Sequence, residues 1–186
     1  MAYQFSDVQI LVVEDMLPIL GLTKSVLQVF GFKNLVSAKN GEEAFKVFCE
    51  HNPDLVITDW IMEPMDGLEL IDQIRENPKS PNPYVPIILM TGYSNRVRVE
   101  SARDQGVTEF LAKPYTARDL YNRIVQIIEN PRQFVKTQDF FGPDRRRRKG
   151  EGYGGPQRRQ SDEISDEQEQ AAEKLLKQMK NDTKEI

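Results

Sequence analysis

The sequence LVITDWIMEPMDG, residues 55–67, decides the fold. It opens with a short run of apolar and β-branched residues that ends at Asp59. A run of four to eight such residues, bounded by polar or turn residues, is typical of a buried strand. Three similar runs end at Glu14-Asp15, at Thr91 and at Lys113. Each of these four predicted strands therefore carries polar side chains at its carboxyl end.

Amphipathic segments alternate with the predicted strands. Apolar residues at helical spacing between Pro18 and Gly31 predict the first helix, with proline near its start and glycine at its end. Similar patterns follow Asn40-Gly41 and Gly67, and Thr116 begins a predicted capping box. A further helix is predicted around Arg96 to Gln105. The strands are predicted at Val8 to Val13, Leu35 to Ala38, Leu55 to Thr58, Ile87 to Met90 and Phe110 to Ala112.

This alternation predicts an α/β fold of the flavodoxin-like type, a doubly wound five-stranded parallel sheet in the order 2-1-3-4-5 flanked by five helices. The carboxyl ends of parallel strands lie at one edge of such a sheet. Three carboxylates, a hydroxyl and an ammonium would then share one site. Such a set can hold a divalent cation, offer a carboxylate nucleophile and supply donors to phosphoryl oxygens. That chemistry is reversible phosphorylation of an aspartate.

Composition and charge divide the chain into three segments. Of its 186 residues 39% are hydrophobic, and most of the large aliphatic ones lie before Pro131. Residues 1–131 and 161–186 carry an excess of acidic groups, whereas residues 132–160 carry an excess of basic ones, within a net charge of −4. We therefore expect one domain over 1–131, followed by a tail.

Several classes of protein are disfavoured by the sequence. A single cysteine, Cys49, forms no intrachain disulfide and fits a small core residue in a reducing cytoplasm. No apolar stretch reaches the length of a membrane span, and no secretory signal opens the chain, so we expect a cytoplasmic protein without membrane insertion. The only histidine, His51, fits a solvated surface position. ATP binding is not expected, because no GxxxxGK[ST] phosphate loop is present.

Four motifs in order carry a resemblance to a known family. They are ED at 14–15, DWIMEPMDG at 59–67, TG at 91–92 and KP at 113–114. Together they resemble the receiver domain of two-component response regulators of the chemotaxis type, from about residue 6 to about residue 130. The resemblance implies that Asp59 is the phosphorylated residue. It also implies a site for Mg²⁺ or Mn²⁺ made by Glu14, Asp15, Asp59 and the backbone carbonyl of Ile61.

The same resemblance implies roles for the remaining strand-end residues. Lys113 would pair with phosphoryl oxygens, and Thr91 would donate its hydroxyl to them. Thr91 and Phe110 would form the switch that carries the phosphorylation signal to the surface, although Phe110 can equally be a plain core residue. The resemblance also allows a cis Lys113-Pro114 bond, as in the family, although X-Pro bonds in folded proteins are cis only ~5–6% of the time.

The loop after Asp59 departs from the family pattern. Glu63 occupies the usual proline position, and the proline has moved to Pro64. The extra negative charge predicts slower phosphorylation or altered metal affinity. Trp60 directly follows the nucleophile, and we interpret it as a partly exposed aromatic residue that fills the loop.

Beyond Pro131 the helical and strand patterns stop. Residues 132–160 are rich in Gly, Pro and Arg and predict a disordered basic linker, which Phe134, Phe140 and Phe141 could anchor to the domain. The run Arg145 to Lys149 is either a solvated basic segment or a site for nucleic acid or an acidic partner.

The acidic tail, residues 161–186, regains a helical pattern from Ser165 to Lys180. One side of this predicted helix carries Ala172, Leu175, Leu176 and Met179. A helix this short is marginal by itself. It would dock on a partner, dock on the receiver, or stay solvated.

These observations predict a phosphoacceptor switch. It would accept a phosphoryl group from a histidine kinase or phosphotransfer protein and signal to a downstream protein target, in chemotaxis or a phosphorelay. The only catalysis expected is self-catalysed phosphoryl transfer and autodephosphorylation.

Three alternative functions compete with this one. One is a transcriptional regulator that contacts DNA through Arg145 to Arg148, although no folded DNA-reading motif accompanies them. Another is a receiver-like module that binds partners without phosphorylation. A phosphatase of the haloacid dehalogenase type is disfavoured, because it needs a second aspartate two residues after the nucleophile, where Ile61 stands.

Overall fold

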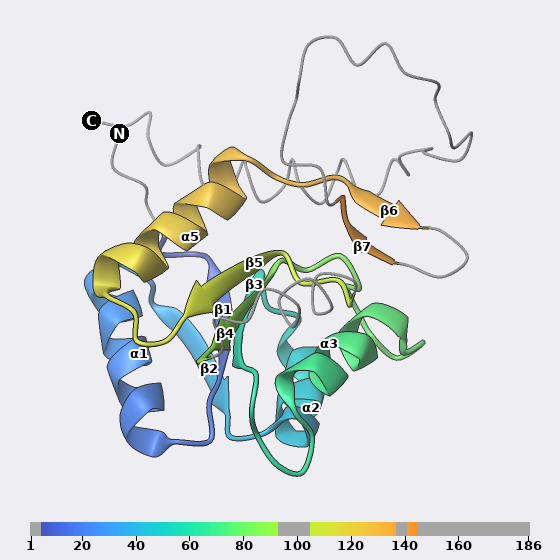
Figure 1. Cartoon of the computed structure of the whole chain (residues 1–186), viewed down its shortest axis with the longest axis horizontal. Helices are drawn as coiled ribbons and strands as arrows, with labels where there is room; N and C mark the ends of the chain where they lie inside the picture. The colour runs from blue at the N-terminus through green and yellow to red at the C-terminus, as the bar shows by residue number, and fades with distance from the viewer. Residues whose placement is uncertain (1–4, 93–104, 137–140, 145–186) are drawn as a thin grey trace, which may run out of the picture.

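The elements of the structure follow the predicted alternation. The computed structural model describes residues 5–92, 105–136 and 141–144 (Figure 1). The helix predicted around Arg96 lies outside these residues, so the described chain contains four of the five expected helices. In chain order the elements are β1 (Gln9–Val13), α1 (Leu17–Val29), β2 (Asn34–Ala38), α2 (Gly41–His51), β3 (Leu55–Asp59), α3 (Gly67–Glu76), β4 (Ile87–Thr91), β5 (Glu109–Ala112), α5 (Ala117–Glu129), β6 (Phe134–Lys136) and β7 (Phe141–Pro143).

The first five strands form one sheet in the order β2-β1-β3-β4-β5, and every pairing in it is parallel. The predicted doubly wound fold is therefore confirmed. The register places Val13 opposite Thr58, Asp59 opposite Met90, and Thr91 opposite Ala112. The carboxyl ends of β1, β3, β4 and β5 consequently meet at one edge of the sheet.

Helices cover both faces of this sheet, because successive strand side chains point to opposite faces. Ile10 and Val12 of β1 belong to the core under α1 and α5. Leu11 and Val13 belong to the core under α2 and α3. Figure 1 shows α1 and α5 on one side of the sheet and α2 and α3 on the other. Each fully buried aliphatic side chain in these two layers stabilises the fold by about 1.5–3 kcal/mol.

The helix ends lie where the sequence predicts them. Pro18 occupies the first turn of α1, and Gly31 follows the end of that helix with a φ of +101°. Asn40 caps α2 by accepting a hydrogen bond from the backbone N–H of Glu43 at 2.9 Å. At the start of α5 the predicted capping box is present, with Thr116 and Asp119 bonded reciprocally. Local capping chemistry thus sets the boundaries of these helices.

The region after Pro131 differs from the prediction of a linker that is disordered from its start. Strands β6 and β7 pair as an antiparallel hairpin within residues 132–144. Phe134 and Phe141 contact the ring of Tyr84 edge to face, at centroid distances of 5.4 and 5.2 Å. The predicted anchoring role is confirmed for these two phenylalanines, while Phe140 lies outside the described residues. The described fold therefore extends to Asp144.

A buried arginine holds this hairpin against α3. The Arg75 guanidinium donates to the carbonyls of Gly106, Pro83 and Val85 at 2.6–3.2 Å, and the Phe134 ring lies 5.0 Å from it. Burial lowers the pKa of Arg75 to about 9. Carbonyl acceptors compensate such a cation only in part, which explains why the aromatic ring covers it.

A second contact ties the chain after α5 to β5. The carboxylate of Glu109 is buried and pairs with Arg132 at 2.7 Å and with Arg123 at 3.5 Å.

Residues 145–160 and the predicted helix at 165–180 fall outside the described chain. Among the residues that the structure describes, no helix is both long and apolar enough to cross a membrane.

Candidate functional site

Lys113 joins two carboxylates at the carboxyl-end edge of the sheet. Its Nζ lies 2.7 Å from Oε2 of Glu14 and 3.0 Å from Oδ1 of Asp59. These residues come from the ends of β1, β3 and β5, which the parallel topology brings together. Glu14 is fully buried, whereas the side chains of Asp59 and Lys113 are 13% and 21% exposed. An incoming group can therefore reach Asp59 and Lys113.

A third carboxylate completes an acidic cluster. One ligand oxygen from each of Glu14, Asp15 and Asp59 lies within 4.8 Å of the others. Asp15 is exposed, so the cluster opens to solvent on that side. Three carboxylates against one ammonium leave an excess of negative charge, which a hard cation with oxygen ligands would neutralise.

Burial and charge shift the pKa values at this site. Burial raises the pKa of Glu14, and the charge of Asp59 raises it further, while the hydrogen bond from Lys113 opposes both. Burial alone would lower the pKa of Lys113, but hydrogen bonds to Glu14 and Asp59 and their charges outweigh it and raise that pKa. Lys113 therefore remains a cation at neutral pH.

The loop after β3 is folded back onto Asp59. The N–H of Trp60 donates to Oδ1 of Asp59 at 2.9 Å, and the N–H of Gly67 donates to the carbonyl of Trp60 at 2.9 Å. A Cβ atom at Gly67 would overlap the Asp59 carbonyl oxygen. Trp60 is half-buried, as predicted, and the Glu63-Pro64 bond is cis.

Sequence reasoning used Gly67 only as a helix start and missed its role in this loop. Asp66 caps α3 in a capping box with Glu69. The sequence contained the signal for this cap, which is an aspartate followed three residues later by a glutamate.

The comparison with protein families decides the identity of the fold. The family model of the response regulator receiver domain matches residues 10–125. The chain belongs to this family. The four motifs that carry the resemblance in the sequence therefore belong to a receiver of two-component signal transduction.

Individual relatives and solved structures agree with this assignment. The receiver is 29% identical over 123 residues to chemotaxis protein CheY-3 of Vibrio cholerae, covering 66% of this chain and 93% of that protein. It is 30% identical over 121 residues to chemotaxis protein CheY of Pseudomonas aeruginosa, covering 65% of this chain and 96% of that protein. It also matches a response regulator receiver domain protein from Clostridium thermocellum, with a TM-score of 0.59, 30% identity and coverage of 66% of this chain and 94% of that one.

A larger protein contains a similar segment. Histidine kinase P4 of Formosa agariphila is 33% identical over 121 residues, which is 65% of this chain and 8% of the kinase. Receiver-like segments of this kind thus occur both in small chemotaxis proteins and within a much larger histidine kinase.

The remaining predicted residues of the receiver lie in or directly after strands of the same sheet. Thr91 ends β4 and is buried, and its carbonyl accepts a hydrogen bond from the Lys113 N–H at 2.7 Å. Phe110 of β5 is half-buried and packs against the core under α2 and α3. Ile61 follows Asp59 by two residues, with a side chain that is 56% exposed. The Lys113-Pro114 bond is cis, which the resemblance allows. The switch role of Thr91 and Phe110 and the metal role of the Ile61 carbonyl stay predictions.

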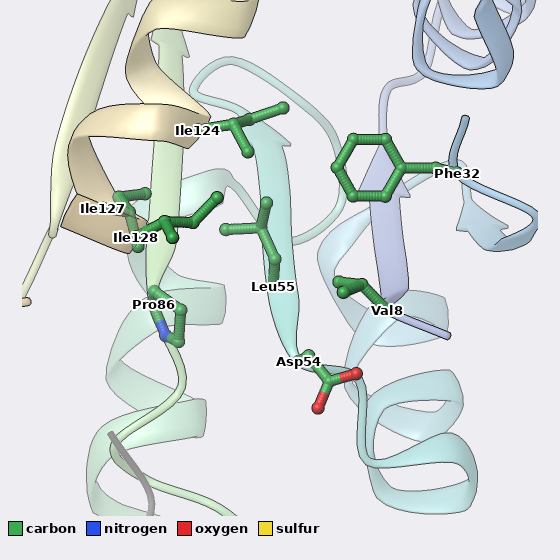
Figure 2. A pocket seen from close by; sticks show the side chains of 8 residues that line it. All are labelled: Val8, Phe32, Asp54, Leu55, Pro86, Ile124, Ile127 and Ile128. Atoms are coloured by element: carbon green, nitrogen blue, oxygen red, sulfur yellow. The ribbon is translucent and has the colours of Figure 1, made fainter. Parts of the chain in front are cut away.

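A cavity under α5 lies away from this site. Figure 2 shows its lining, in which apolar side chains surround the space and the carboxylate of Asp54 points away from it. Its volume is about 10 Å³, which is at the lower limit for a single water molecule. Asp54 accepts a hydrogen bond from the Gln9 N–H at 2.9 Å, so its carboxylate has a structural partner. A cavity of this size is too small for an organic ligand.

Two further residues discussed from the sequence, His51 and Cys49, lie in α2. His51 is exposed in the last turn of α2. Cys49 is half-buried, its thiol lies 3.6 Å from the Lys79 carbonyl, and burial raises the pKa of the thiol. A raised pKa lowers the thiolate fraction, which makes this cysteine a poor nucleophile.

Proposed function

We propose that this receiver is a phosphoacceptor switch in which Asp59 takes a phosphoryl group from a phosphohistidine of a histidine kinase or phosphotransfer protein. One observation carries the proposal: Lys113 lies 3.0 Å from the Asp59 carboxylate within a cluster of three carboxylates. A carboxylate that is accessible and paired with a cation can attack phosphorus, and the same cation can then accompany the negative phosphoryl group.

The acidic cluster fits a divalent cation such as Mg²⁺ or Mn²⁺. Carboxylate oxygens of Glu14, Asp15 and Asp59 lie close enough together to ligate one ion, and such hard cations prefer oxygen ligands. The carbonyl of Ile61 would be a further ligand. The cation, when bound, supplies charge neutralisation for the oxygens of the phosphoryl group.

In the proposed transfer, a carboxylate oxygen of Asp59 attacks phosphorus while the phosphorus–nitrogen bond of the phosphohistidine breaks, and the electron pair stays on the imidazole. Lys113 then shifts part of its interaction from the Asp59 carboxylate to the phosphoryl oxygens, while its 2.7 Å contact with Glu14 holds the ammonium in place. Thr91 donates its hydroxyl to the same oxygens. Water attack on the acyl phosphate returns Asp59 and inorganic phosphate.

The output of the proposed switch is a protein contact. The displacement of Thr91 toward the phosphoryl group would be followed by Phe110, which lies between the core and the surface. Relatives that bear the name of chemotaxis proteins support signalling to a downstream protein target.

The proposal is tested by the intact mass of the protein after incubation with a small acyl phosphate donor. Wild type, Asp59→Asn and Asp72→Asn are compared with and without Mg²⁺. Asp72 is a half-buried carboxylate of α3 and is not a member of the acidic cluster, so its variant is the matched control. We expect one phosphoryl addition on wild type and on the control, only with Mg²⁺, and none on Asp59→Asn.

Absence of addition on the folded wild-type protein would contradict the proposed function. The protein would then be a receiver-like module that acts without phosphorylation, and Glu63→Gln would test whether the charge in the loop prevents the reaction. Addition on Asp59→Asn would place the phosphoryl group on another residue and would equally contradict the assignment.

A further inference from the structure

The loop after β5 is tied to α1 by a hydrogen bond between two hydroxyl groups. The hydroxyls of Thr23 and Tyr115 lie 2.7 Å apart. The Thr23 hydroxyl also donates to the Ile19 carbonyl at 2.9 Å, which uses its only hydrogen. The Tyr115 hydroxyl is therefore the donor in the contact between the two side chains. Thr23 is buried, and Tyr115 is half-buried against the core under α1 and α5.

The same two segments are joined a second time through Lys113 and Glu14. Tyr115 follows Lys113 by two residues in the loop after β5, and Thr23 lies on the helix that follows Glu14. The two hydrogen bonds join residues that are 99 and 92 positions apart in the chain. The loop after β5 is thus linked at two points to the segment formed by β1 and α1, and only one of these links involves the acidic cluster.

The position of β5 in the sheet explains why a second link matters. β5 is the last strand in the order β2-β1-β3-β4-β5, so β4 separates it from β3, which carries Asp59. The side chain of Lys113 must therefore cross the end of β4 to reach Asp59 and Glu14. The Lys113 N–H is held by the Thr91 carbonyl of β4, and the capping box at Thr116 ties the following residues to α5. Neither of these contacts fixes the loop relative to β1.

A hydrogen bond suits such a positioning role better than apolar packing does. Leu20 and Leu27 are buried on α1 with Thr23, and they contact the core through apolar surface, which has little directional preference. A hydroxyl pair at 2.7 Å restricts both the distance and the angle between the two side chains. A buried hydroxyl that loses its partner also costs free energy, which favours the paired arrangement.

We infer that Tyr115 is a positioning residue, which holds the loop after β5 on α1 through Thr23 and so keeps the Lys113 ammonium between Glu14 and Asp59. A displacement of about 1 Å at a reacting group can slow a reaction by up to about a hundredfold. The Tyr115 hydroxyl therefore supports the rate at which Asp59 is phosphorylated. This effect on the reaction rests on the proposed function, whereas the position of Lys113 does not.

Acetylation of lysine side chains tests the position of Lys113 without phosphorylation. The folded full chain is treated with a limiting amount of acetic anhydride, and the labelling rate of Lys113 is measured by peptide mass relative to that of the exposed Lys33. Tyr115→Phe removes one hydroxyl and keeps the ring. Tyr121→Phe is the matched control, because Tyr121 is a half-buried tyrosine of α5 that packs against the same core.

We expect Tyr115→Phe to raise the relative labelling rate of Lys113 about fivefold, the factor that corresponds to one neutral hydrogen bond. Tyr121→Phe should leave this rate unchanged. Phosphorylation of Asp59 by a small acyl phosphate donor should slow by a similar factor in Tyr115→Phe only. A purely structural role of Tyr115 would lower the free energy of unfolding but would not change the labelling of Lys113 in the folded protein.

A double-substitution cycle shows whether Thr23 is the partner through which Tyr115 acts. Thr23→Val replaces the hydroxyl with a methyl group and should raise Lys113 labelling by the same factor as Tyr115→Phe. The double variant should show no further increase, because both substitutions remove the same bond. Additive effects of the two substitutions would overturn the inference, because the residues would then act independently.

Two other results would also overturn the inference. One is Lys113 labelling that is equal in wild type and Tyr115→Phe, and the other is an equal increase in Tyr121→Phe. If the wild-type protein accepts no phosphoryl group, the proposed function fails, and the labelling of Lys113 still decides whether Tyr115 positions it.

Discussion

The two ends of the central sheet differ in how their charged side chains are paired. At the carboxyl end, Lys113 is shared between Glu14 and Asp59, and Asp15 adds a third carboxylate without a further cation among the described residues. At the amino end, Arg75 donates four hydrogen bonds to backbone carbonyls, and Glu109 pairs with two arginines. The first arrangement leaves an excess of negative charge, whereas the second surrounds each buried charge with hydrogen-bond or ion-pair partners.

This difference separates function from structure. Charge that is left unbalanced and open to solvent can bind an ion or attack a phosphoryl group, but it contributes little to stability. Charge that is enclosed and held by several hydrogen bonds fixes the position of a segment and is costly to disturb. The carboxyl end is therefore the reactive end, and the amino end fastens the β6–β7 hairpin to the receiver.

The strongest test of this contrast is Arg75→Met. Methionine keeps most of the volume but removes the Arg75 donors from three carbonyls, those of Val85 and Gly106 in buried residues and that of Pro83 in a half-buried one, so we expect the free energy of unfolding to fall by about 3 kcal/mol. Urea denaturation measures the loss, and the exposed Arg118→Met is the control, with an expected change within about 0.5 kcal/mol.

Phosphorylation of Asp59 by a small donor should be unchanged in Arg75→Met under folding conditions. If the rate of phosphorylation fell while the stability did not, the amino end would belong to the reactive machinery and the contrast would fail.

A smaller effect is expected from Gly67→Ala at the carboxyl end. The new methyl group would overlap the Asp59 carbonyl oxygen, and the forced shift should cost about 2 kcal/mol. Because the shift displaces the nucleophile, the rate of Asp59 phosphorylation should fall as well. The control is Gly21→Ala, where the added methyl group has free space within α1 and should stabilise the helix by about 0.5–1 kcal/mol. A Gly67→Ala protein with wild-type stability and rate would show that the loop does not position Asp59.

The smallest expected effect on stability is that of Asp72→Asn, a substitution in α3. Burial, followed by the charges of Glu76, Asp66 and Glu69, raises the pKa of Asp72 to about 6. After allowance for solvent screening, we expect Asp72→Asn to raise the free energy of unfolding by about 1 kcal/mol at pH 7.

The free energy of unfolding gained by Asp72→Asn should increase with pH. Between the unfolded pKa of Asp72, near 4, and the folded value of about 6, the folded state binds more protons, so wild-type stability falls as pH rises through this window. The advantage of Asp72→Asn should therefore shrink to a small fraction at pH 4, disappear at lower pH and be nearly complete at pH 7. Urea denaturation across this range measures it, and an equal gain at pH 4 and pH 7 would refute the raised pKa as its cause.

Much of the receiver was predictable from local patterns. The five parallel strands and their order followed from alternating apolar runs and helical stripes, and the capping box at Thr116 lies where predicted. Glu14, Asp59 and Lys113 meet as predicted because they lie at the carboxyl ends of parallel strands, which share one edge of the sheet.

Other features were not predictable, because they depend on contacts between distant segments. The β6–β7 hairpin has three-residue strands, too short to show a period, and its position depends on Tyr84 and Arg75. The need for glycine at position 67 arises from the carbonyl of Asp59, eight residues earlier, which only the folded loop brings close.

The sequence by itself determined the order of the strands and the chemistry at their ends, because side-chain periodicity and capping act over a few residues. The tertiary structure alone decided which charges are balanced and which are not. Lys113 and Arg75 are both cations in the sequence, and only the packing gives one of them two carboxylates and the other four bonds to carbonyl oxygens. Charge balance depends on distances and burial, and these are set by the fold as a whole.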